Sequence, residues 1–346
     1  MIGGRELISK AVQTLRAGSL VVFPTETVYG LGADATNSSA IDKIYRAKGR
    51  PGTNPLIVHV ADATVARRYA RRWPVEAEKL AQEFWPGPLT LVVLKQDTIA
   101  SNVTAGKPTV GLRVPSHPLA LELLRGFDGP VAAPSANRSN RVSPTTAEHV
   151  NSEIGPSVDI ILDGGPCQVG IESTVLDLTG VKPVILRPGM ITQIQIEQII
   201  GTPVQLFTGS VKETEAASSP GQQSLHYAPN AAAYRFDRND MDKVMIWCRA
   251  RMTESWMILT VGSPSGDLAV FQDDVTRTAK PGIHHRVLEM PGNADEYARR
   301  LYAVLREIDR LGVGTVWIEM PADRPAWTAL RDRLTRATRE IPGRLV

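Results

Sequence analysis

Two cations, Lys48 and Arg50, stand one residue apart and lead into a loop that Pro51 and Pro55 stiffen. Lysine supplies a compact positive charge and arginine a planar fork, a pairing that proteins use to bind phosphate groups. Because proline fixes its own φ, the loop presents both charges with little conformational freedom left to lose. The pattern predicts a polyphosphate site. The alternative is that Lys48 only caps the C-terminal end of a helix.

A second polar segment, residues 24–32, directly follows an apolar run and reads PTETVYGLG. Its hydroxyl groups and the carboxylate of Glu26 precede two glycines, Gly30 and Gly32. Donors and acceptors at the end of a strand lie where α/β sheets bind ligands. The segment is therefore a candidate part of a site, although an ordinary strand-to-helix turn has a similar composition.

Arg113 lies in the otherwise apolar segment 109–115, TVGLRVP. A buried guanidinium that meets no anion costs several kcal/mol, so the sequence predicts either an anionic ligand or a structural salt bridge. His59 stands among apolar residues in segment 56–60. Taken alone, this pattern is more typical of a core histidine than of a ligand-binding one.

Small residues dominate segment 132–137, AAPSAN, and Ser143 follows shortly after it. Small side chains let a ligand approach the backbone, while Ser135 and Asn137 offer a hydroxyl and an amide. No Ser–His–Asp set, HExxH motif or catalytic pair of carboxylates stands out in the sequence, which disfavours covalent and metalloprotease chemistry.

Between residues 43 and 72, eight basic side chains accompany a single acid, Asp62. Such a concentration of positive charge suits an anionic ligand, phosphate above all. For the pairs Arg67-Arg68 and Arg71-Arg72, however, the i, i+4 spacing favours one solvated side of a helix.

Short apolar runs alternate with helical patterns over the first 200 residues, which predicts an α/β sheet with helices packed against it. We expect strands at residues 19–23, 56–60, 89–94, 110–114, 131–133, 160–162, 173–177 and 184–186. We expect helices at residues 39–48, 63–71, 75–84, 118–125 and 194–200. The polar segments fall within or at the ends of these elements.

A stretch of small and polar residues at 208–223 interrupts this pattern, which then restarts. We expect β-type runs at 244–247, 256–261 and 315–319, and helices at 295–311 and 326–338. The chain therefore divides into a first domain (1–205), a linker (206–232) and a smaller C-terminal α/β domain (233–346). Without a GxGxxG or Walker sequence, a Rossmann-like shape in the second domain implies no nucleotide.

Composition excludes several classes of protein. The 346 residues are 42% hydrophobic and 22% charged, which is typical of globular proteins. A net charge of +3 gives no global nucleic-acid footprint, and no apolar run approaches the roughly 18 residues of a membrane span. Two cysteines outside any CxxC spacing argue against zinc or iron–sulfur sites and for a reducing compartment. With no secretory signal pattern, we expect a cytoplasmic protein.

Several motifs in fixed order carry a family resemblance. They are PTETVYGLGA (24–33), the KxR of residues 48–50 before NPLIVHV (54–60), WPGPLTLV (85–92), GLRVP (111–115), APSAN (133–137), and ESTVLD (172–177) with RPG (187–189). Together they resemble the YrdC-like threonylcarbamoyl-AMP synthases over residues 5–200. The resemblance implies a YrdC-like twisted mixed sheet with flanking helices, and the tail looks like the longer, two-domain form.

The resemblance implies that L-threonine, bicarbonate and ATP react to give threonylcarbamoyl-AMP and pyrophosphate, for the threonylcarbamoyladenosine modification of tRNA. The implied threonine site consists of Thr27, His59, Arg113, Ala133 and Ser173. The implied ATP site consists of Arg50, Asn54, Thr109, Ser135, Asn137, Ser143, Arg187 and Tyr227. Lys48 and Arg50 are the expected catalytic pair at the phosphates. Magnesium would bind together with ATP, held by phosphate oxygens rather than by a set of protein ligands. The expected downstream partners are tRNA or transfer proteins, and no membrane is expected to take part.

The linker departs from the family pattern, in which SPGM, basic and aromatic residues, and HYAP follow one another. Here residues 219–229 read SPGQQSLHYAP. Because His226 and Tyr227 remain, we expect a lid over the nucleotide; a plain tether is the alternative. Two other functions conflict with the sequence. A module that binds double-stranded RNA or tRNA without synthase activity conflicts with the near-neutral charge. A carbamoyl-transferring relative from hydrogenase maturation would carry zinc fingers, which two cysteines cannot supply.

Overall fold

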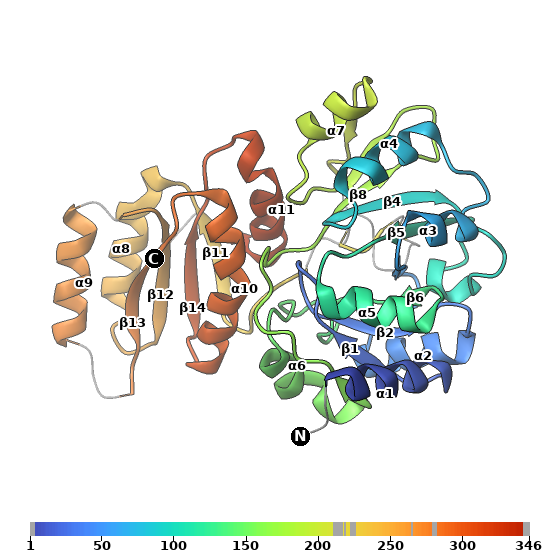
Figure 1. Ribbon diagram of the computed structural model, residues 1–346. Coiled ribbons are helices and arrows are strands. Elements are labelled where there is room, and N and C mark those ends of the chain that lie inside the picture. Colours follow the sequence, from blue (N-terminus) through green and yellow to red (C-terminus); the bar gives the residue numbers. More distant parts are fainter. Residues whose placement is uncertain are drawn as a thin grey trace. The chain divides into compact units, whose positions relative to one another are not determined.

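Figure 1 shows the computed structural model of the chain, which describes residues 4–209, 217, 219–221, 226–263, 266–278 and 282–341. The chain separates into two compact units, each with its own sheet. The first unit contains Met1–Ser139 and Ser143–Ser224, and the second contains Asn140–Val142 and Leu225–Val346. The three residues 140–142 therefore belong to the second unit although they interrupt the first in sequence.

The sheet of the first unit has the strand order β10-β9-β8-β4-β5-β3-β6-β2-β1-β7. Its strands are β1 (Val21–Phe23), β2 (Gly30–Asp34), β3 (Ile57–His59), β4 (Leu89–Leu94), β5 (Thr109–Arg113), β6 (Val131–Ala132), β7 (Ile160–Ile161), β8 (Thr174–Asp177), β9 (Val184–Arg187) and β10 (Gln205–Leu206). Parallel pairs such as β3–β5 adjoin antiparallel pairs such as β4–β5. The predicted mixed sheet is confirmed.

Helices pack on both faces of this sheet (Figure 1). They are α1 (Gly4–Arg16), α2 (Ser38–Lys48), α3 (Ala63–Tyr69), α4 (Val75–Phe84), α5 (Pro118–Phe127), α6 (Ala147–Ile154) and α7 (Gln193–Ile200). Leu15 of α1 and Leu123 of α5 share a core cluster with Val21, whereas Ile44 of α2 packs in the cluster that contains Val22. Because neighbouring strand residues point to opposite faces, the two clusters lie on the two sides of the sheet.

At the β4–β8–β9 end, helices α4 and α7 cover one face of the sheet through a cluster that includes Leu91 and Leu176. The opposite face carries a small apolar cluster of four buried residues, namely Ile57, Val92, Val175 and Leu186. In the described part of the chain, Ser219 and Pro220 line a small cavity over three of these four residues.

Two features at the ends of α2 place the predicted cation pair. The side chain of Asn37 accepts a hydrogen bond from the backbone N–H of Ala40 and so caps the start of the helix. Gly49 ends it in the left-handed region, at φ 58°, where glycine carries no steric penalty. Lys48 is therefore the last helical residue, and Arg50 begins the loop.

Strand register brings residues from distant segments together. In the parallel β3–β5 pair, His59 lies opposite Arg113. In the antiparallel β3–β6 pair, Val58 lies opposite Ala132, and the backbone N–H of Ala133 donates to the carbonyl of Ile57 at 2.9 Å. The ends of β3, β5 and β6 therefore present His59, Arg113 and Ala133 at neighbouring positions.

The second unit is a parallel sheet in the order β13-β12-β14-β11-β15, and each neighbouring pair is parallel. Its strands are β11 (Ala232–Phe236), β12 (Trp256–Val261), β13 (His285–Met290), β14 (Thr315–Glu319) and β15 (Arg339–Glu340). Its helices are α8 (Met241–Ala250), α9 (Gly266–Thr278), α10 (Ala294–Arg310) and α11 (Thr328–Ala337). The expected Rossmann-like α/β architecture is confirmed.

One predicted element is wrong, and one has a different form. Residues 244–247 form the middle of helix α8 rather than a strand, with Val244 and Cys248 buried one turn apart. The glycine-rich residues after Tyr29 form strand β2 and not only a turn. A Cβ on Gly32 would lie 2.8 Å from Phe23, so glycine lets β2 pack closely on that ring. No helix in the described ranges is long and apolar enough to cross a membrane.

Candidate active site

Arg113 is held in a buried network with the segment that follows β1. Its Nη2 donates to Oε1 of Glu26 at 2.6 Å and to Oγ1 of Thr27 at 3.0 Å. The side chains of Arg113 and Glu26 are 4% and 5% exposed. The structural salt bridge considered from sequence is therefore present. A buried pair of this kind is sensitive to the loss of either partner, because the remaining charge has no water to solvate it.

His59 lies beside this network on the neighbouring strand. Burial, reinforced by the nearby positive charge of Arg113, holds the pKa of His59 well below its usual value. The imidazole is therefore neutral at pH 7. Its Nδ1 is buried with no hydrogen-bond partner among the described residues. An unsatisfied buried nitrogen is unfavourable in the empty protein and suits a polar ligand at this point.

Lys48 is buried at the end of α2, and its ammonium group contacts the loop after β6. Nζ donates to the backbone carbonyls of Ser135 and Asn137, and lies 3.4 Å from Oδ1 of Asn137. Burial, followed by the charge of Arg50, lowers the pKa of Lys48 well below its usual value. The structure thus brings together three of the predicted residues, one from the KxR motif and two from APSAN.

Arg50 and Asn54 stand at the two ends of the proline-stiffened loop. Arg50 donates to the carbonyl of Asn54 from Nε at 3.1 Å and to that of Pro55 from Nη2 at 2.9 Å. Asn54 is only 1% exposed, yet neither Oδ1 nor Nδ2 has a hydrogen-bond partner among the described residues. Leaving a whole amide unsatisfied costs about 1–3 kcal/mol per group. A ligand that hydrogen-bonds this amide would remove that cost.

Ser173 and Arg187 meet on the adjacent strands. Arg187 donates to Ser173 twice, from Nε to the backbone carbonyl and from Nη2 to Oγ, both at 3.1 Å. Oγ of Ser173 also lies 2.8 Å from Oγ1 of Thr90. Earlier in the chain, Ser143 donates from Oγ to Glu172 Oε1 at 2.6 Å. The predicted serines are therefore connected to groups that the sequence interpretation did not assign.

Thr109 lines a small cavity on the face of the sheet opposite α4 and α7. The cavity is about 10 Å³, room for about one water, and residues of β3, β4, β5 and β8 line it together with Ser219 and Pro220. Gly111 forms part of its floor, where an added Cβ would lie 3.1 Å from Thr90. The linker is also tied to the KxR loop, because the N–H of Ala217 donates to the carbonyl of Thr53 at 3.1 Å.

Tyr227 belongs to the second unit, unlike the other predicted site residues. Its ring stacks on Tyr302 with centroids 5.8 Å apart, and the guanidinium of Arg333 lies 5.1 Å from its ring centroid. Its backbone φ is 62°, a conformation that bulky residues rarely adopt. Within the expected linker, residues 210–216, 218 and 222–225 lie outside the described residues.

Three groups that the sequence interpretation left without a role occupy this region: Glu26, Thr90 and Glu172. Thr90 resembles any threonine in a strand, so its type gives no signal. Glu172 adjoins Ser173 in an otherwise apolar stretch, and this buried carboxylate could have been recognised from its position. Glu26 was noted as a polar residue, but its partner Arg113 is 87 residues away, beyond the reach of a local pattern.

The paired arginines of the basic stretch lie on the surface. Arg67 forms an ion pair with Glu78, and Arg71 forms one with Asp97. Both guanidinium groups are about half exposed, at 43% and 57%. Exposed pairs of this kind contribute about 0–1 kcal/mol. For these arginines, the solvated interpretation agrees with the structure.

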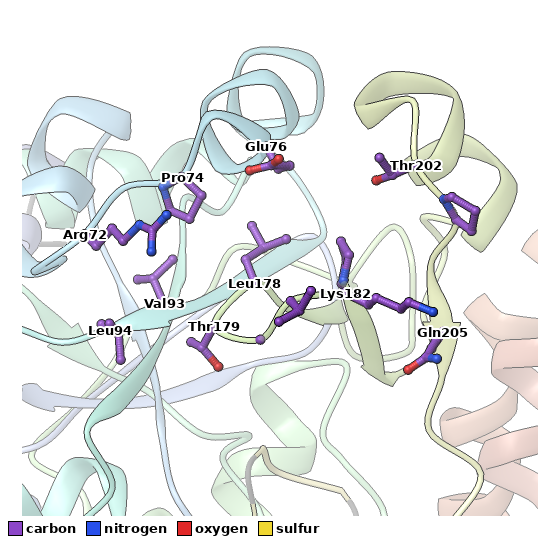
Figure 2. Close-up of a pocket in the computed structure, with 14 residues that line it drawn as sticks. Arg72, Pro74, Glu76, Val93, Leu94, Leu178, Thr179, Lys182, Thr202 and Gln205 are labelled. Carbon is purple, nitrogen blue, oxygen red and sulfur yellow. The ribbon is translucent and has the colours of Figure 1, made fainter.

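A larger cavity of about 890 Å³ lies between the start of α4, the β8–β9 turn and the α7–β10 turn. Figure 2 shows its lining, with Leu178 near the centre and Arg72, Glu76 and Lys182 around it. None of the predicted site residues lines this cavity. Val93 of its wall points to the face of the sheet opposite Val92, so the cavity is on the α4–α7 side. It is not the candidate active site.

Two family models together match almost the whole chain. One is described as "Telomere recombination" and matches residues 13–189. The other is described as "Threonylcarbamoyl-AMP synthase, C-terminal domain" and matches residues 191–338. The boundary between the two matched regions, near residue 190, lies within the first compact unit and before strand β10.

Similar proteins carry the same description. The threonylcarbamoyl-AMP synthase of Pyrococcus abyssi is 38% identical over 94% of this chain and 92% of its own length. The threonylcarbamoyl-AMP synthase of Schizosaccharomyces pombe is 34% identical over 96% of this chain and 88% of its own length. The crystal structure of P. abyssi Sua5 complexed with L-threonine superposes with a TM-score of 0.85, at 35% identity, over 99% of this chain and 98% of that one. The chain therefore belongs to the threonylcarbamoyl-AMP synthase family.

Proposed function

We propose that this protein is an L-threonylcarbamoyladenylate synthase. It converts L-threonine, bicarbonate and ATP into threonylcarbamoyl-AMP and pyrophosphate. The first unit carries the reaction, residues 206–232 link it to the C-terminal domain, and the product serves the threonylcarbamoyl modification of tRNA in the cytoplasm. Family membership over nearly the full chain supports this activity.

The observation that carries the proposal is the imbalance of buried charge in the first unit. Among its described residues, four cations are buried, namely Lys48, Arg50, Arg113 and Arg187, against two carboxylates, Glu26 and Glu172. Burying net positive charge is unfavourable unless an anion compensates it. A triphosphate and an amino-acid carboxylate supply such anions. The unsatisfied amide of Asn54 adds a need for hydrogen bonds from a ligand.

We assign the threonine subsite to Thr27, His59, Arg113, Ala133 and Ser173. Arg113 is the proposed partner of the threonine carboxylate, and Glu26 holds its guanidinium in place through Nη2. The neutral imidazole of His59 adds no second positive charge there, and its Nδ1 is available to a polar group of the substrate. The crystal structure of the P. abyssi relative with L-threonine supports an amino-acid site in this fold.

We assign the ATP subsite to Arg50, Asn54, Thr109, Ser135, Asn137, Ser143, Arg187 and Tyr227, with Lys48 and Arg50 at the phosphates. Arg50 and Asn54 share one stiff loop, and Lys48 reaches the APSAN loop from the preceding helix end. The apolar face around Val92 and Val175 suits a flat adenine ring, with Ser219 and Pro220 over it. Because the empty cavity holds only about one water, this linker segment must move for a nucleotide to enter.

The chemistry then depends on position and charge. The threonine amine condenses with bicarbonate to a carbamate, with loss of water. A carbamate oxygen attacks the α-phosphorus of ATP, and the bond from that phosphorus to the bridging oxygen of pyrophosphate breaks. Such a transfer needs in-line alignment and neutralisation of the leaving charge more than a general base. Lys48 and Arg50 supply positive charge toward the leaving pyrophosphate.

Magnesium fits as a companion of ATP rather than as a resident of the protein. Within the described residues, no group of three or more His, Cys, Asp or Glu side chains could hold a metal ion. Of the buried carboxylates described in the first unit, Glu26 is engaged by Arg113 and Glu172 by Ser143. Magnesium prefers phosphate oxygens, water and one or two carboxylates, and bound this way it neutralises phosphate charge.

Pyrophosphate release tests this function. Wild-type protein and the Lys48→Ala/Arg50→Ala variant are incubated with ATP, magnesium and bicarbonate, with and without L-threonine. We expect release in the wild type that requires both threonine and bicarbonate, and at least a 100-fold loss in the variant, on the order of two lost charge-assisted contacts. Release without threonine, or binding of RNA with a steep salt dependence and no release, would refute the synthase assignment.

A further inference from the structure

The cavity of about 890 Å³ in the first unit, named here the α4–α7 cavity, has no part in the proposed synthase site. Its floor exists because two strands lead past the helices that cover them. Helices α4 and α7 pack over Leu91 of β4 and Leu176 of β8. Leu94, at the end of β4, and Leu178, directly after β8, remain half-buried and line the cavity. The volume is large enough for a ligand group well beyond a single side chain.

Hydrogen bonds hold the walls of this cavity in place. Oδ1 of Asp177 accepts from the backbone N–H and from Oγ1 of Thr179, at 2.8 and 2.6 Å, which fixes the turn between β8 and β9. On the α7 side, Nε2 of Gln193 donates to the carbonyl of Val204 at 2.9 Å, and Oε1 of Glu197 accepts from the N–H of Val204 at 2.8 Å. Three prolines also line the cavity, namely Pro74, Pro183 and Pro203. Because proline fixes its own φ, the walls have little freedom left to lose when the cavity is filled.

Exposed apolar side chains surround the opening. Among the described residues of the first unit, the exposed large hydrophobic side chains are Val75, Val181, Ile194 and Leu206. Val181 lines the cavity, and Val75 and Leu206 each adjoin a lining residue in sequence. Ile194 follows Gln193, whose side chain is bonded to the segment before β10. Exposed apolar groups that gather in one place mark interaction surfaces, whereas single ones do not.

The lining also carries three charged side chains, Arg72, Glu76 and Lys182. None of these three side chains forms a hydrogen bond or an ion pair with another residue in the part of the chain that the structure describes. Figure 2 shows the two cations on opposite sides of the apolar floor. Two cations against one carboxylate leave the lining positive, so an occupant with acidic groups on both sides of an apolar group would complement it.

The exposed rim favours a protein as the occupant. A small molecule inside the cavity would leave Val75, Ile194 and Leu206 in water, since these three side chains do not line it. A second copy of this chain, seated by the same surface about a two-fold axis, would place cations against cations. Nucleic acid needs a row of cations at its phosphates, whereas this rim is apolar. An acidic and apolar segment of a partner protein meets both the charge and the rim.

We infer that the α4–α7 cavity and its rim form a docking site for a partner protein, which inserts an apolar side chain flanked by carboxylates. The inserted side chain packs on Leu94 and Leu178, and its flanking carboxylates pair with Arg72 and Lys182. The site goes beyond the proposed synthase function and does not depend on it, because no residue of the proposed substrate sites lines this cavity.

Selection from a random dodecapeptide library displayed on mRNA tests this site. The full chain is the target, with ATP and L-threonine present in excess so that the proposed substrate sites are occupied. We expect the enriched peptides to share an apolar residue with Asp or Glu on both sides. A synthetic copy of an enriched peptide is then titrated against each variant by fluorescence polarisation.

The charge-reversed variant Arg72→Glu/Lys182→Glu should bind this peptide at least about 10-fold more weakly, as for two reversed charge pairs. Val181→Asp should weaken binding as well, and its side chain is fully exposed, so folding is not at risk. The matched control is Lys10→Glu/Arg125→Glu, which reverses one lysine and one arginine at exposed positions of α1 and α5. Its affinity should stay within about twofold of the wild type, since surface charges this far from the peptide are screened.

Pyrophosphate release should be unchanged in all of these variants. Absence of enrichment, enriched peptides that lack acidic residues, or equal affinity for the wild type and the charge-reversed variant would overturn the docking site. An equal loss of affinity in the matched control would overturn it too, because net charge alone would then explain binding. Failure of the synthase function would instead appear in the wild type, as absence of threonine-dependent pyrophosphate release.

Discussion

The two units treat buried charge in opposite ways. In the second unit, buried Glu319 accepts hydrogen bonds from Nε and Nη2 of Arg238 and from the backbone N–H of Val261. Buried Arg333 donates a hydrogen bond to the carboxylate of Asp332. In the first unit, the hydrogen bonds of buried Lys48 end on amide oxygens, and the amide of Asn54 has no partner among the described residues. The second unit neutralises its charges internally, whereas the first leaves part of this task to a ligand.

This difference separates structural from functional polarity in one chain. A buried ion pair that is complete, such as Arg238 with Glu319, needs no ligand to balance its charge, although one partner of such a pair can also meet a substrate, as proposed for Arg113. A buried cation or amide that lacks its complement lowers the stability of the empty protein, and that cost is recovered only when substrate binds. The three changes below test this distinction, beginning with the largest expected effect.

Removing Arg113 should cause the largest loss. Arg113→Ala leaves the carboxylate of Glu26 buried without its partner, and we expect about 3–5 kcal/mol of destabilisation in chemical unfolding. Threonine binding, measured by calorimetry on the folded fraction, should be lost as well. Arg238→Ala in the second unit should cost clearly less, because that guanidinium is 60% exposed and water already screens the pair.

A double variant sharpens this test. Glu26→Gln/Arg113→Ala removes both charges and should recover much of the stability without recovering threonine binding. Threonine binding that survives in Arg113→Ala unchanged would exclude Arg113 as the carboxylate partner.

Because Lys48 is buried, ATP binding should depend on pH. Burial lowers the pKa of this lysine, with Arg50 lowering it further and Glu153 opposing. Its amine is therefore neutral above a pKa that lies below the usual lysine range, and a neutral amine does not balance phosphate charge. We expect ATP affinity to fall as pH rises through that lowered pKa, by up to about tenfold per pH unit. Between the lowered pKa and the usual lysine pKa, ATP binding should be accompanied by uptake of a proton.

Calorimetry in buffers of different ionisation enthalpy measures the uptake directly. Lys48→Arg keeps its charge over the whole range, so its affinity should show no such fall. A wild-type ATP affinity that stays level to pH 10, or no proton uptake at any pH, would show that Lys48 is already charged in the empty site.

Asn54 should give the smallest effect on stability, and one of unusual sign. Asn54→Leu removes an amide that has no partner in the empty protein, so stability should stay equal or rise by about 1 kcal/mol. ATP affinity should fall about tenfold for the loss of a hydrogen-bonding group. Thermal unfolding with and without ATP measures both. A destabilised empty protein would mean that the amide already serves the fold.

The contrast also explains what could be predicted from the sequence. Lys48 and Arg50 were recognised because two cations lead into a loop stiffened by two prolines, whereas Asn54 was assigned through the family resemblance. Ser135 and Asn137 were also predicted as site residues, but the hydrogen bonds of Lys48 to their backbone carbonyls were not, since the two residues are more than 80 positions away. The role of any carbonyl is independent of side-chain type, so no sequence pattern reports it.

The fold shows the same limit. Periodic segments such as α4 and β4 were predicted at their observed bounds, because an amphipathic helix and an apolar strand each have a strong local pattern. Residues 244–247 were assigned to a strand because Val244, Ile246 and Trp247 favour strands. Burial of Val244 and Cys248 against the parallel sheet selects a helix instead, and that packing is a tertiary effect.

The most direct test of the account is the identity of the adenylate that the protein makes. Wild-type protein, ATP, magnesium, L-threonine and ¹³C-labelled bicarbonate are mixed, and the products are read by mass spectrometry. The account predicts threonylcarbamoyl-AMP that carries the label in its carbamoyl carbon, with one pyrophosphate for each product molecule. Threonyl-AMP without the label, or ADP and phosphate in place of AMP-linked product, would contradict it.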